Sequence, residues 1–263
     1  MIIVGEKLNS SIPKMHELMK DKNTEELKRI AIEQEKAGAN YLDINTAIFR
    51  KQEADMMEYV LGIVTENTSC GIMLDSPSPA VIEKALELVP GRAVIINSIT
   101  LQDRINELLP LAKKYNTGIV CLPIDMEGIP KTAEKRLENS LKLVEILQKE
   151  GIEKDKIYID VLAEALAVDN ESAKVSIDTI AGLRKAHPEI HIICGVSNIS
   201  FGLPKRAAIN SAFLTAAIYA GLDSGIVDIT NEQIKSTIYI AEMVAGKDEY
   251  CIEYLGYFRS IDG

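Results

Sequence analysis

The segment "HIICGVSNISFGLP" at residues 191–204 starts as a buried strand and ends as a polar loop. Its first half is apolar enough to fill a core, whereas Ser197 and Asn198 follow directly and Pro204 closes the segment. A short apolar run bounded by turn residues is typical of a strand in a parallel sheet covered by helices. The segment therefore predicts a covered parallel strand that presents an asparagine at its tip.

Seven other segments share this apolar character, and segments with helical periodicity lie between them. The additional predicted strands are 2–8, 39–45, 70–76, 93–99, 117–125, 157–163 and 224–229. The predicted helices are 24–37, 46–66, 79–89, 101–115, 133–150, 171–187, 204–220 and 232–245. Eight strands that each precede a helix predict an α/β protein with the (β/α)8 TIM barrel fold. A doubly wound open sheet is the alternative, but its Gly-rich first turn does not match "GEKLN" at 5–9.

Length and charge narrow the class of protein further. The length of 263 residues and the hydrophobic fraction of 47% are typical of one barrel domain. We therefore expect a single domain over 1–263 with a C-terminal extension at 246–263. The net charge of −10 and the lack of a basic run disfavour binding to nucleic acid or to an anionic membrane. The N-terminal residues do not resemble a secretion signal, and no stretch approaches the roughly 20 apolar residues of a membrane span. We therefore expect a cytoplasmic protein.

The cysteines and histidines do not follow a metal-binding pattern. The four cysteines are far apart in the sequence, and none of the three histidines has a second ligand at helical spacing. We expect buried, reduced thiols and no metal bound by this chain.

Hydrogen-bonding residues lie at or near the end of every predicted strand. They are Glu6, Asn9, Asp43, Asn45, Asp75, Ser76, Asn97, Ser98, Asp125, Asp160, Ser197, Asn198 and Asp228. In a parallel barrel these ends meet at one mouth, where active sites are built. Any one Asp or Asn at such a position is more often a helix cap or an Asx turn, and we interpret Asp43, Asn45, Asp125 and Asp228 in this way.

The composition of this ring indicates the chemistry of its ligand. The ring is rich in carboxylates and carboxamides and lacks both histidine and a Gly-rich phosphate loop. An ionised aspartate can form a bidentate, charge-assisted bond with one ring N–H and one amino group. A 2-amino-4-oxo-pyrimidine offers this edge.

Six motifs together resemble a known family. They are "GEKLN" at 5–9, "GANYLDIN" at 38–45, "LDS" at 74–76, "INSI" at 96–99, "YIDVL" at 158–162 and "GVSNISFGLP" at 195–204. In this order, the chain resembles the pterin-binding methyltransferases that move a methyl group between tetrahydrofolate and a corrinoid protein. This family includes the folate module of cobalamin-dependent methionine synthase.

The resemblance implies a role for seven residues. Asp75, Asn97 and Asp160 would hold the pyrimidine edge of the pterin, Gly195 would leave room for the ring, Ser197 would contact the substrate, Asn198 would face N5, and Arg206 would lie near the ligand. Arg206 could equally be a structural residue in the first turn of the helix after Pro204. Phe201 departs from the family pattern, because some relatives carry a polar residue there.

The chemistry of demethylation gives a reason for Asn198. A tertiary amine is a poor leaving group, so that charge developing on N5 must be met by a proton or a strong hydrogen bond. An asparagine amide can donate to N5, although it cannot act as an acid, and a proton relayed by an aspartate or by water could do the rest. The structural alternative for Asn198 is a helix cap.

The resemblance also implies partners. Tetrahydrofolate or methyltetrahydrofolate would be the substrate, the corrinoid would be carried by a separate protein, and the chain would form a homodimer, with the aromatic tail at 246–263 as a candidate interface. Transfer to homocysteine is disfavoured, because the isolated cysteines do not form a zinc site. A dihydropteroate synthase-like enzyme and a non-catalytic folate-binding subunit are the alternatives, although "VSN" at 196–198 lacks the basic residues expected of a pyrophosphate site.

Overall fold

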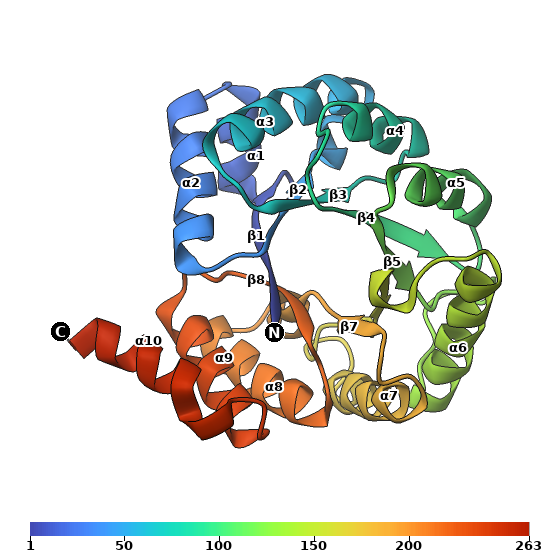
Figure 1. Ribbon diagram of the computed structural model, residues 1–263, viewed down its shortest axis with the longest axis vertical. Helices are drawn as coiled ribbons and strands as arrows, with labels where there is room; N and C mark the ends of the chain where they lie inside the picture. The colour runs from blue at the N-terminus through green and yellow to red at the C-terminus, as the bar shows by residue number, and fades with distance from the viewer. Residues whose placement is uncertain (263) are drawn as a thin grey trace.

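The computed structural model describes residues 1–262, and its eight parallel strands form a ring (Figure 1). The strands are β1 (Ile2–Asn9), β2 (Tyr41–Asn45), β3 (Gly71–Asp75), β4 (Val94–Thr100), β5 (Gly118–Leu122), β6 (Ile157–Asp160), β7 (His191–Ile193) and β8 (Ser224–Val227). Hydrogen bonds join them in the order β7-β6-β5-β4-β3-β2-β1-β8. A parallel bridge between Gly195 and Ile226 links the two ends of this order, which nearly closes the ring. The predicted (β/α)8 barrel is confirmed.

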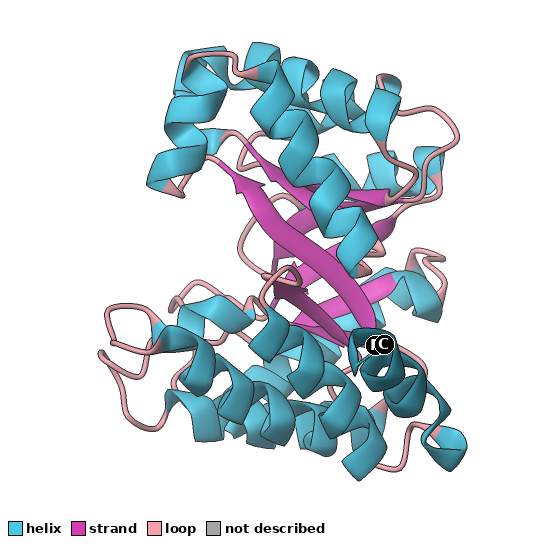
Figure 2. Cartoon of the chain, turned by 90° about the vertical axis from the view of Figure 1, so that its left-hand side faces the viewer, coloured by secondary structure: helices cyan, strands magenta, loops and turns pink. Residues whose placement is uncertain are grey.

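Helices surround the strands on the outside of the ring, as the side view in Figure 2 also shows. They are α1 (Pro13–Lys20), α2 (Thr24–Ala37), α3 (Glu53–Asn67), α4 (Pro79–Glu87), α5 (Ile105–Tyr115), α6 (Ala133–Lys149), α7 (Ser172–Ala186), α8 (Arg206–Ala220), α9 (Glu232–Val244) and α10 (Ile252–Asp262). Short 3-10 helices lie at η1 (Ala47–Gln52), η2 (Lys154–Lys156), η3 (Val196–Ser200) and η4 (Glu249–Cys251). The sequence did not predict α1, and the predicted helix 46–66 is divided into η1 and α3 because Arg50 has a φ of 51°.

Three predicted strands end at least three residues earlier than expected. The strand predicted at 191–198 ends at Ile193, and residues Val196–Ser200 turn into η3. The strand predicted at 157–163 ends at Asp160, since Leu162 adopts a φ of 57°, and that predicted at 117–125 ends at Leu122. After Ile193 the chain turns into η3, and this turn places Ser197 and Asn198 at the mouth of the barrel.

Helix α2 forms where the sequence supplies both an apolar stripe and an N-cap residue. In α2, Leu27, Ile30 and Ala31 are buried against the sheet, and the Asn23 side chain accepts a hydrogen bond from the Glu26 amide at 3.2 Å. Gly38, with a φ of 109°, ends the helix.

Two apolar clusters support the fold. The larger one fills the space between the strands and the helices, and it contains the buried Cys70, Cys121 and Cys194. The smaller one lies inside the ring and consists of Val4, Met73, Ile95, Val120, Tyr158 and Ile193. This inner cluster is the floor of the mouth. The expectation of buried thiols holds for these three cysteines, whereas Cys251 is half-buried in η4.

The C-terminal segment forms η4 and α10, which extends away from the ring (Figure 1). Tyr257 of α10 stacks on Tyr239 of α9 with a centroid distance of 4.3 Å, and its hydroxyl donates to Glu232 at 2.8 Å. These contacts attach α10 to the barrel. Within residues 1–262, none of the helices combines the length and the apolar character required to cross a bilayer.

Candidate active site at the mouth of the barrel

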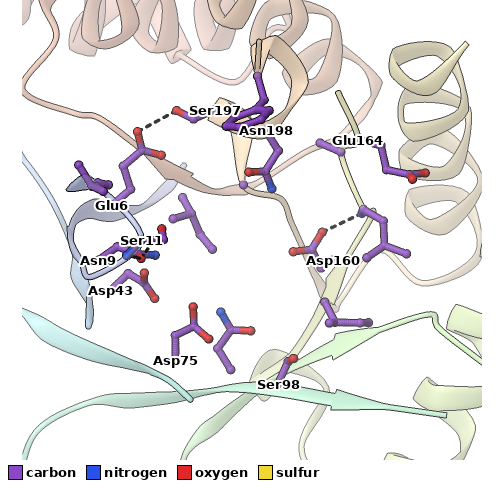
Figure 3. Close-up of a pocket in the computed structure, with 18 of the residues that line it drawn as sticks. Glu6, Asn9, Ser11, Asp43, Asp75, Ser98, Asp160, Glu164, Ser197 and Asn198 are labelled. Carbon is purple, nitrogen blue, oxygen red and sulfur yellow. Dashed lines mark hydrogen bonds between the residues drawn. The ribbon is translucent and has the colours of Figure 1, made fainter. Parts of the chain in front are cut away.

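A cavity of about 790 Å³ opens at the carboxyl ends of the strands (Figure 3). All seven residues singled out in the sequence line it: Asp75, Asn97, Asp160, Gly195, Ser197, Asn198 and Arg206. They come from β3, β4, β6, η3 with the residue before it, and α8. The barrel therefore brings together residues that are up to 131 positions apart in the sequence.

Asp75 and Asn97 are neighbours at the ends of β3 and β4, where their Cα atoms are paired in register. The Asn45 side chain, at the end of β2, donates to Asp75 Oδ2 at 2.7 Å and fixes that carboxyl group. Burial raises the pKa of Asp75, although the bond from Asn45 and the nearby charge of Arg104 oppose this. Asn45 is thus a support for Asp75, which agrees with its interpretation as a structural residue.

Asp43 also lines this cavity, although the sequence suggested only a structural role. Its side chain is 2% exposed, and Oδ1 has no hydrogen-bond partner among the described residues. Burial raises the pKa of Asp43 well above its usual value, and the charges of Asp75 and Glu6 raise it further. The missed signal was its alternation with Leu42 and Ile44, which face the helices and therefore turn the residue between them into the barrel.

Asp160 lies opposite this group and is held by its own loop. The Leu162 amide donates to Asp160 Oδ1 at 2.7 Å. Burial raises the pKa of Asp160 to about 6, while this amide and the charge of Arg136 act in the opposite direction. The left-handed conformation of Leu162 aims the amide at the carboxyl group, and a non-glycine residue holds it only when its surroundings enforce it.

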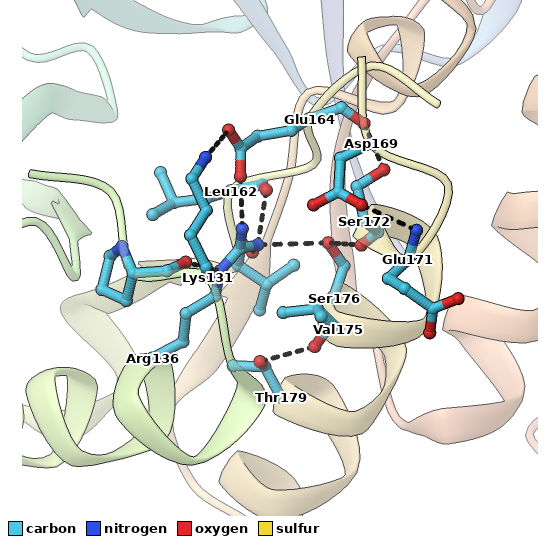
Figure 4. Close-up of polar contacts among 12 residues, drawn as sticks. Lys131, Arg136, Leu162, Glu164, Asp169, Glu171, Ser172, Val175, Ser176 and Thr179 are labelled. Carbon is cyan, nitrogen blue, oxygen red and sulfur yellow. Dashed lines mark hydrogen bonds and ion pairs between the residues drawn. The ribbon is translucent and has the colours of Figure 1, made fainter. Parts of the chain in front are cut away.

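Arg136 of α6 enforces this conformation (Figure 4). Its side chain is 1% exposed, and Nη1 donates to the carbonyl oxygens of Val161 and Leu162 at 2.7 and 2.6 Å. Nη2 pairs with Glu164, which lines the cavity, at 2.6 Å. This role of Arg136 could not be predicted from the sequence, because its partners are mostly backbone carbonyl groups.

Asn198 is carried by η3, whose position depends on Arg206. The Arg206 guanidinium donates from Nη2 to the Ser197 carbonyl at 2.7 Å and from Nε to Ser200 Oγ at 3.1 Å. A Cβ atom on Gly195 would lie 2.9 Å from Asn198 Nδ2, so that Gly195 leaves room for the asparagine amide. Arg206 is the first residue of α8 and also lines the cavity. It is therefore both a structural residue of the first helical turn and a residue near the candidate ligand site.

Two further strand-end residues, Asp125 and Asp228, do not line this cavity. Asp125 accepts a hydrogen bond from the Asn139 side chain at 2.8 Å, and Asp228 pairs with Lys7 at 3.2 Å. These contacts agree with the structural interpretation of the two aspartates.

The site can hold a flat heterocycle that carries several N–H groups. Carboxyl groups from four strands face one opening, and Asn97 and Asn198 add carboxamides that both donate and accept. Burial strengthens each hydrogen bond that these groups form with a ligand. Fold and site together define a (β/α)8 barrel protein whose mouth presents carboxyl and carboxamide groups to a ligand.

The comparison with known families gives this class a name. The chain belongs to the family of pterin binding enzymes, whose model matches residues 5–228. It is 33% identical to a methylcorrinoid:tetrahydrofolate methyltransferase of Eubacterium limosum, over 98% of this chain and 96% of that protein. It is also 34% identical to the methionine synthase of Mycobacterium tuberculosis over 86% of this chain, which corresponds to only 20% of the length of the synthase.

Solved structures of dihydropteroate synthases share the fold. The enzyme of Coxiella burnetii in complex with pteroic acid is 18% identical, with a TM-score of 0.64, over 92% of this chain and 94% of that one. The Yersinia pestis enzyme in a sulfonamide complex is 15% identical, with a TM-score of 0.68, over 93% and 94% of the two chains. At this level of identity the likeness concerns the fold alone.

Proposed function

We propose that this protein is a methyltransferase that moves a methyl group between N5 of tetrahydrofolate and the cobalt of a separate corrinoid protein. The observation that carries the proposal is the meeting of Asp75, Asn97, Asp160 and Asn198 in one cavity. The similarity to the methylcorrinoid:tetrahydrofolate methyltransferase extends over nearly the whole chain and supports the same reaction.

In this proposal, the carboxyl side of the cavity binds the pterin. Asp75 and Asp160 accept hydrogen bonds from its ring N–H and amino groups, and Asn97 both donates to and accepts from the same edge. Binding favours the ionised carboxylates, which burial disfavours in the empty site. Pterin affinity therefore falls as the pH drops below the pKa of about 6 of Asp160.

Asn198 stands on the opposite side, on η3. Its amide donates to N5 as the methyl group leaves and meets the charge that develops there. Gly195 gives the amide space to move, and Arg206 holds the turn that carries it.

The corrinoid is a substrate that arrives on its own protein, and it must reach N5 from the open side of the cavity. The rim there is apolar: Ile12, Ile129 and Phe201 line the cavity and are 38%, 40% and 68% exposed. Such a rim suits the docking of a second protein and the exclusion of water. Phe201, which departs from the family pattern, would contribute to this rim.

A dihydropteroate synthase-like reaction is the second candidate, supported by the shared fold. That reaction releases pyrophosphate, which calls for several cations at the mouth. Here Arg206 already donates to Ser197 and Ser200, and Lys131 pairs with Glu164. The methyltransferase is therefore the better fit.

The decisive experiment is stopped-flow mixing of the protein with tetrahydrofolate and methylcobalamin, in which the absorbance of cob(I)alamin reports methyl transfer. We expect transfer with the wild type, and a rate about 100-fold lower for Asn198→Ala with tetrahydrofolate affinity within about threefold. Asn139→Ala, which removes a buried amide outside the cavity, is the control for folding. A wild type that binds folate without transferring methyl groups would be the non-catalytic folate-binding subunit.

The remaining expectations concern the molecule as a whole. We propose one pterin-binding barrel over residues 1–263, with 246–263 as its extension, in a homodimer. Exposed apolar side chains gather at α8, α9 and the C-terminal segment: Tyr219, Ile240, Val244, Tyr250 and Ile252. Sedimentation velocity tests the dimer, and Ile252→Glu should give a monomer.

A cytoplasmic location fits the four free thiols, since reduced cysteines persist in reducing compartments.

A further inference from the structure

A second, smaller cavity of about 170 Å³ lies beside the main one. Three residues, Glu6, Ser197 and Arg206, line both cavities and form the boundary between them. The side cavity extends from this boundary toward α8 and the end of β8, where Asn210 and Asp228 line it. Its volume has room for several water molecules, since one water needs only about 10–15 Å³ measured in this way.

The side cavity is built for water. The side-chain oxygen Oδ1 of Asn210 is buried and has no hydrogen-bond partner among the described residues, although Asn210 as a whole is 6% exposed. A buried acceptor of this kind is normally satisfied by a donor, and a water molecule in the adjoining cavity would supply one. Asp228 and Arg206 offer further partners to such water.

Glu6 stands at the boundary between this cavity and the site. Its carboxylate accepts a hydrogen bond from Ser197 Oγ at 2.7 Å, and Ser197 precedes Asn198 in η3 (Figure 3). Burial raises the pKa of Glu6 to about 7, and Asp228 raises it further, while the bond from Ser197 lowers it. The other charged groups that act on Glu6 are Arg206, Lys7 and Asp43.

The reaction needs a group that exchanges a proton. Transfer from methyltetrahydrofolate to cob(I)alamin breaks the bond between the methyl carbon and N5 and leaves its electron pair on N5. The electron pair of the cobalt forms the new bond to carbon, and one proton must reach N5. In the opposite direction N5 loses that proton. The Asn198 amide can donate a hydrogen bond but cannot supply the proton.

We propose that Glu6 carries the proton which the methyl transfer takes up or releases, and that it exchanges this proton with solvent through water in the side cavity. The inference rests on the proposed methyl transfer and names a group that this function leaves open. Asn198 stabilises the departing nitrogen, and Glu6 delivers or accepts the proton, directly or through one water in the main cavity. One carboxyl group therefore serves both directions, since its protonated and ionised forms are both populated near neutral pH.

The test compares Glu6→Gln with the wild type over a range from about pH 5 to about pH 9, with methyltetrahydrofolate and cob(I)alamin as probes. We expect a single-turnover rate at pH 7 about 100-fold lower in Glu6→Gln, with the wild-type inflection near pH 7 absent. Methyltetrahydrofolate affinity, measured by fluorescence, should stay within about threefold. A merely structural role for Glu6 would lower the rate and leave the inflection in place.

Two variants sharpen the test by moving the inflection in opposite directions. Ser197→Ala removes the hydrogen bond that lowers the Glu6 pKa, so that the inflection should move to higher pH. Asp228→Asn removes a charge that raises this pKa and releases Lys7 from its ion pair, so that the inflection should move to lower pH. Shifts of the same sign, or none, overturn the assignment to Glu6.

A measurement without catalysis separates the inference from the proposed function. In carboxyl-labelled protein, ¹³C NMR should give a glutamate resonance that titrates near pH 7 and is missing in Glu6→Gln. If the wild type transfers methyl groups and Glu6→Gln keeps its pH profile, the inference fails alone. If the wild type transfers none, the proposed function fails, and the NMR titration still decides whether Glu6 can hold a proton at neutral pH.

Discussion

The pKa values of buried carboxyl groups shift in opposite directions at the two ends of the barrel. At the mouth, burial raises the pKa values of Glu6, Asp43, Asp75 and Asp160. At the base, burial also opposes ionisation of Asp223, but the His191 side chain and the Ile192 amide hydrogen-bond to it, Arg184 pairs with it at 2.9 Å, and together they hold its pKa below the usual range. Hydrogen bonds therefore offset burial only in part for the carboxyl groups at the mouth, whereas the partners of Asp223 at the base offset it fully.

This difference means that the charged groups at the base stabilise the fold, whereas the carboxyl groups at the mouth do not. A carboxyl group with a raised pKa in the folded state destabilises the fold once the unfolded chain ionises, whereas one with a lowered pKa stabilises it. At the base, Arg184 stabilises the fold further, because it also donates to the carbonyl oxygens of Pro188, Ile190 and Gly221. At the mouth, the hydrogen bonds to Glu6, Asp75 and Asp160 do not offset burial, which fits a site whose further partner is a ligand.

The largest expected effect comes from the two arginines that organise these ends. Arg136→Met should lower the free energy of unfolding by about 3–5 kcal/mol, because it leaves buried carbonyl groups without a donor and Glu164 with only the exposed Lys131 as an ion-pair partner. It should also weaken tetrahydrofolate binding about tenfold or more, because the Leu162 amide no longer orients Asp160. Urea unfolding and fluorescence titration measure the two quantities.

Arg184→Met is the matched control at the base. It should lower the free energy of unfolding by about 2 kcal/mol, with folate affinity unchanged. Arg136→Lys keeps the charge without the planar fork, and it offers a better-folded variant for the binding measurement. Folate affinity that falls equally after both Arg→Met changes would contradict the separation of the two ends.

A smaller effect, with a definite sign, is expected for the pH dependence of stability. Asp43→Asn should raise the free energy of unfolding at pH 8 by about 1 kcal/mol or more, because it removes a carboxyl group that the fold holds at a raised pKa. The gain should be absent below the unfolded pKa of about 3.9 and should grow as the pH rises above it. Chemical unfolding at several pH values measures this.

Asp223→Asn should show the reverse behaviour. Its stabilising contribution is present above the unfolded pKa and is lost as the pH falls toward the lower folded pKa. The variant should therefore be less stable than the wild type at pH 7, and the difference should shrink in acid. If both variants changed stability in the same direction at pH 7, the contrast between mouth and base would be wrong.

The sequence predicted the barrel well because its two periodicities are local. Apolar runs and amphipathic stripes such as Leu27, Ile30 and Ala31 are set by neighbouring residues, and the polar tips follow from where each run ends. The seven candidate residues meet in one cavity because a parallel barrel gathers all its strand ends on one side.

What the sequence could not predict depends on contacts between distant segments. Arg136 lies in a helix 24 residues before Asp160, and its partners are carbonyl groups that every residue carries. The sequence did not indicate the turn at η3, because the buried Val196 and Ile199 continue the apolar run of β7 after the chain has left the sheet. The burial of Asp43 Oδ1 without a hydrogen-bond partner among the described residues likewise arises only when the strands assemble.

The smallest effect on stability, and the sharpest contrast, is expected for two glycines. A Cβ atom on Gly195 would meet Asn198 Nδ2 at 2.9 Å, and one on Gly225, in β8, would meet Met1 Cε at 2.6 Å. Each contact involves the end of a flexible side chain, and Gly195 has a φ of −76°, which any residue adopts. Both Gly→Ala changes should therefore alter the free energy of unfolding by less than about 1 kcal/mol.

The two variants should differ in catalysis. In Gly195→Ala the group that must shift is the amide that faces N5 in the proposed reaction, so that methyl transfer should fall about tenfold. In Gly225→Ala the group that shifts is a methionine methyl at the base, and the rate should not change. Stopped-flow rates and folate affinities, measured in parallel, test this prediction. If Gly195→Ala lowers only the folate affinity, the new methyl group contacts the pterin and not Asn198, and the prediction is wrong.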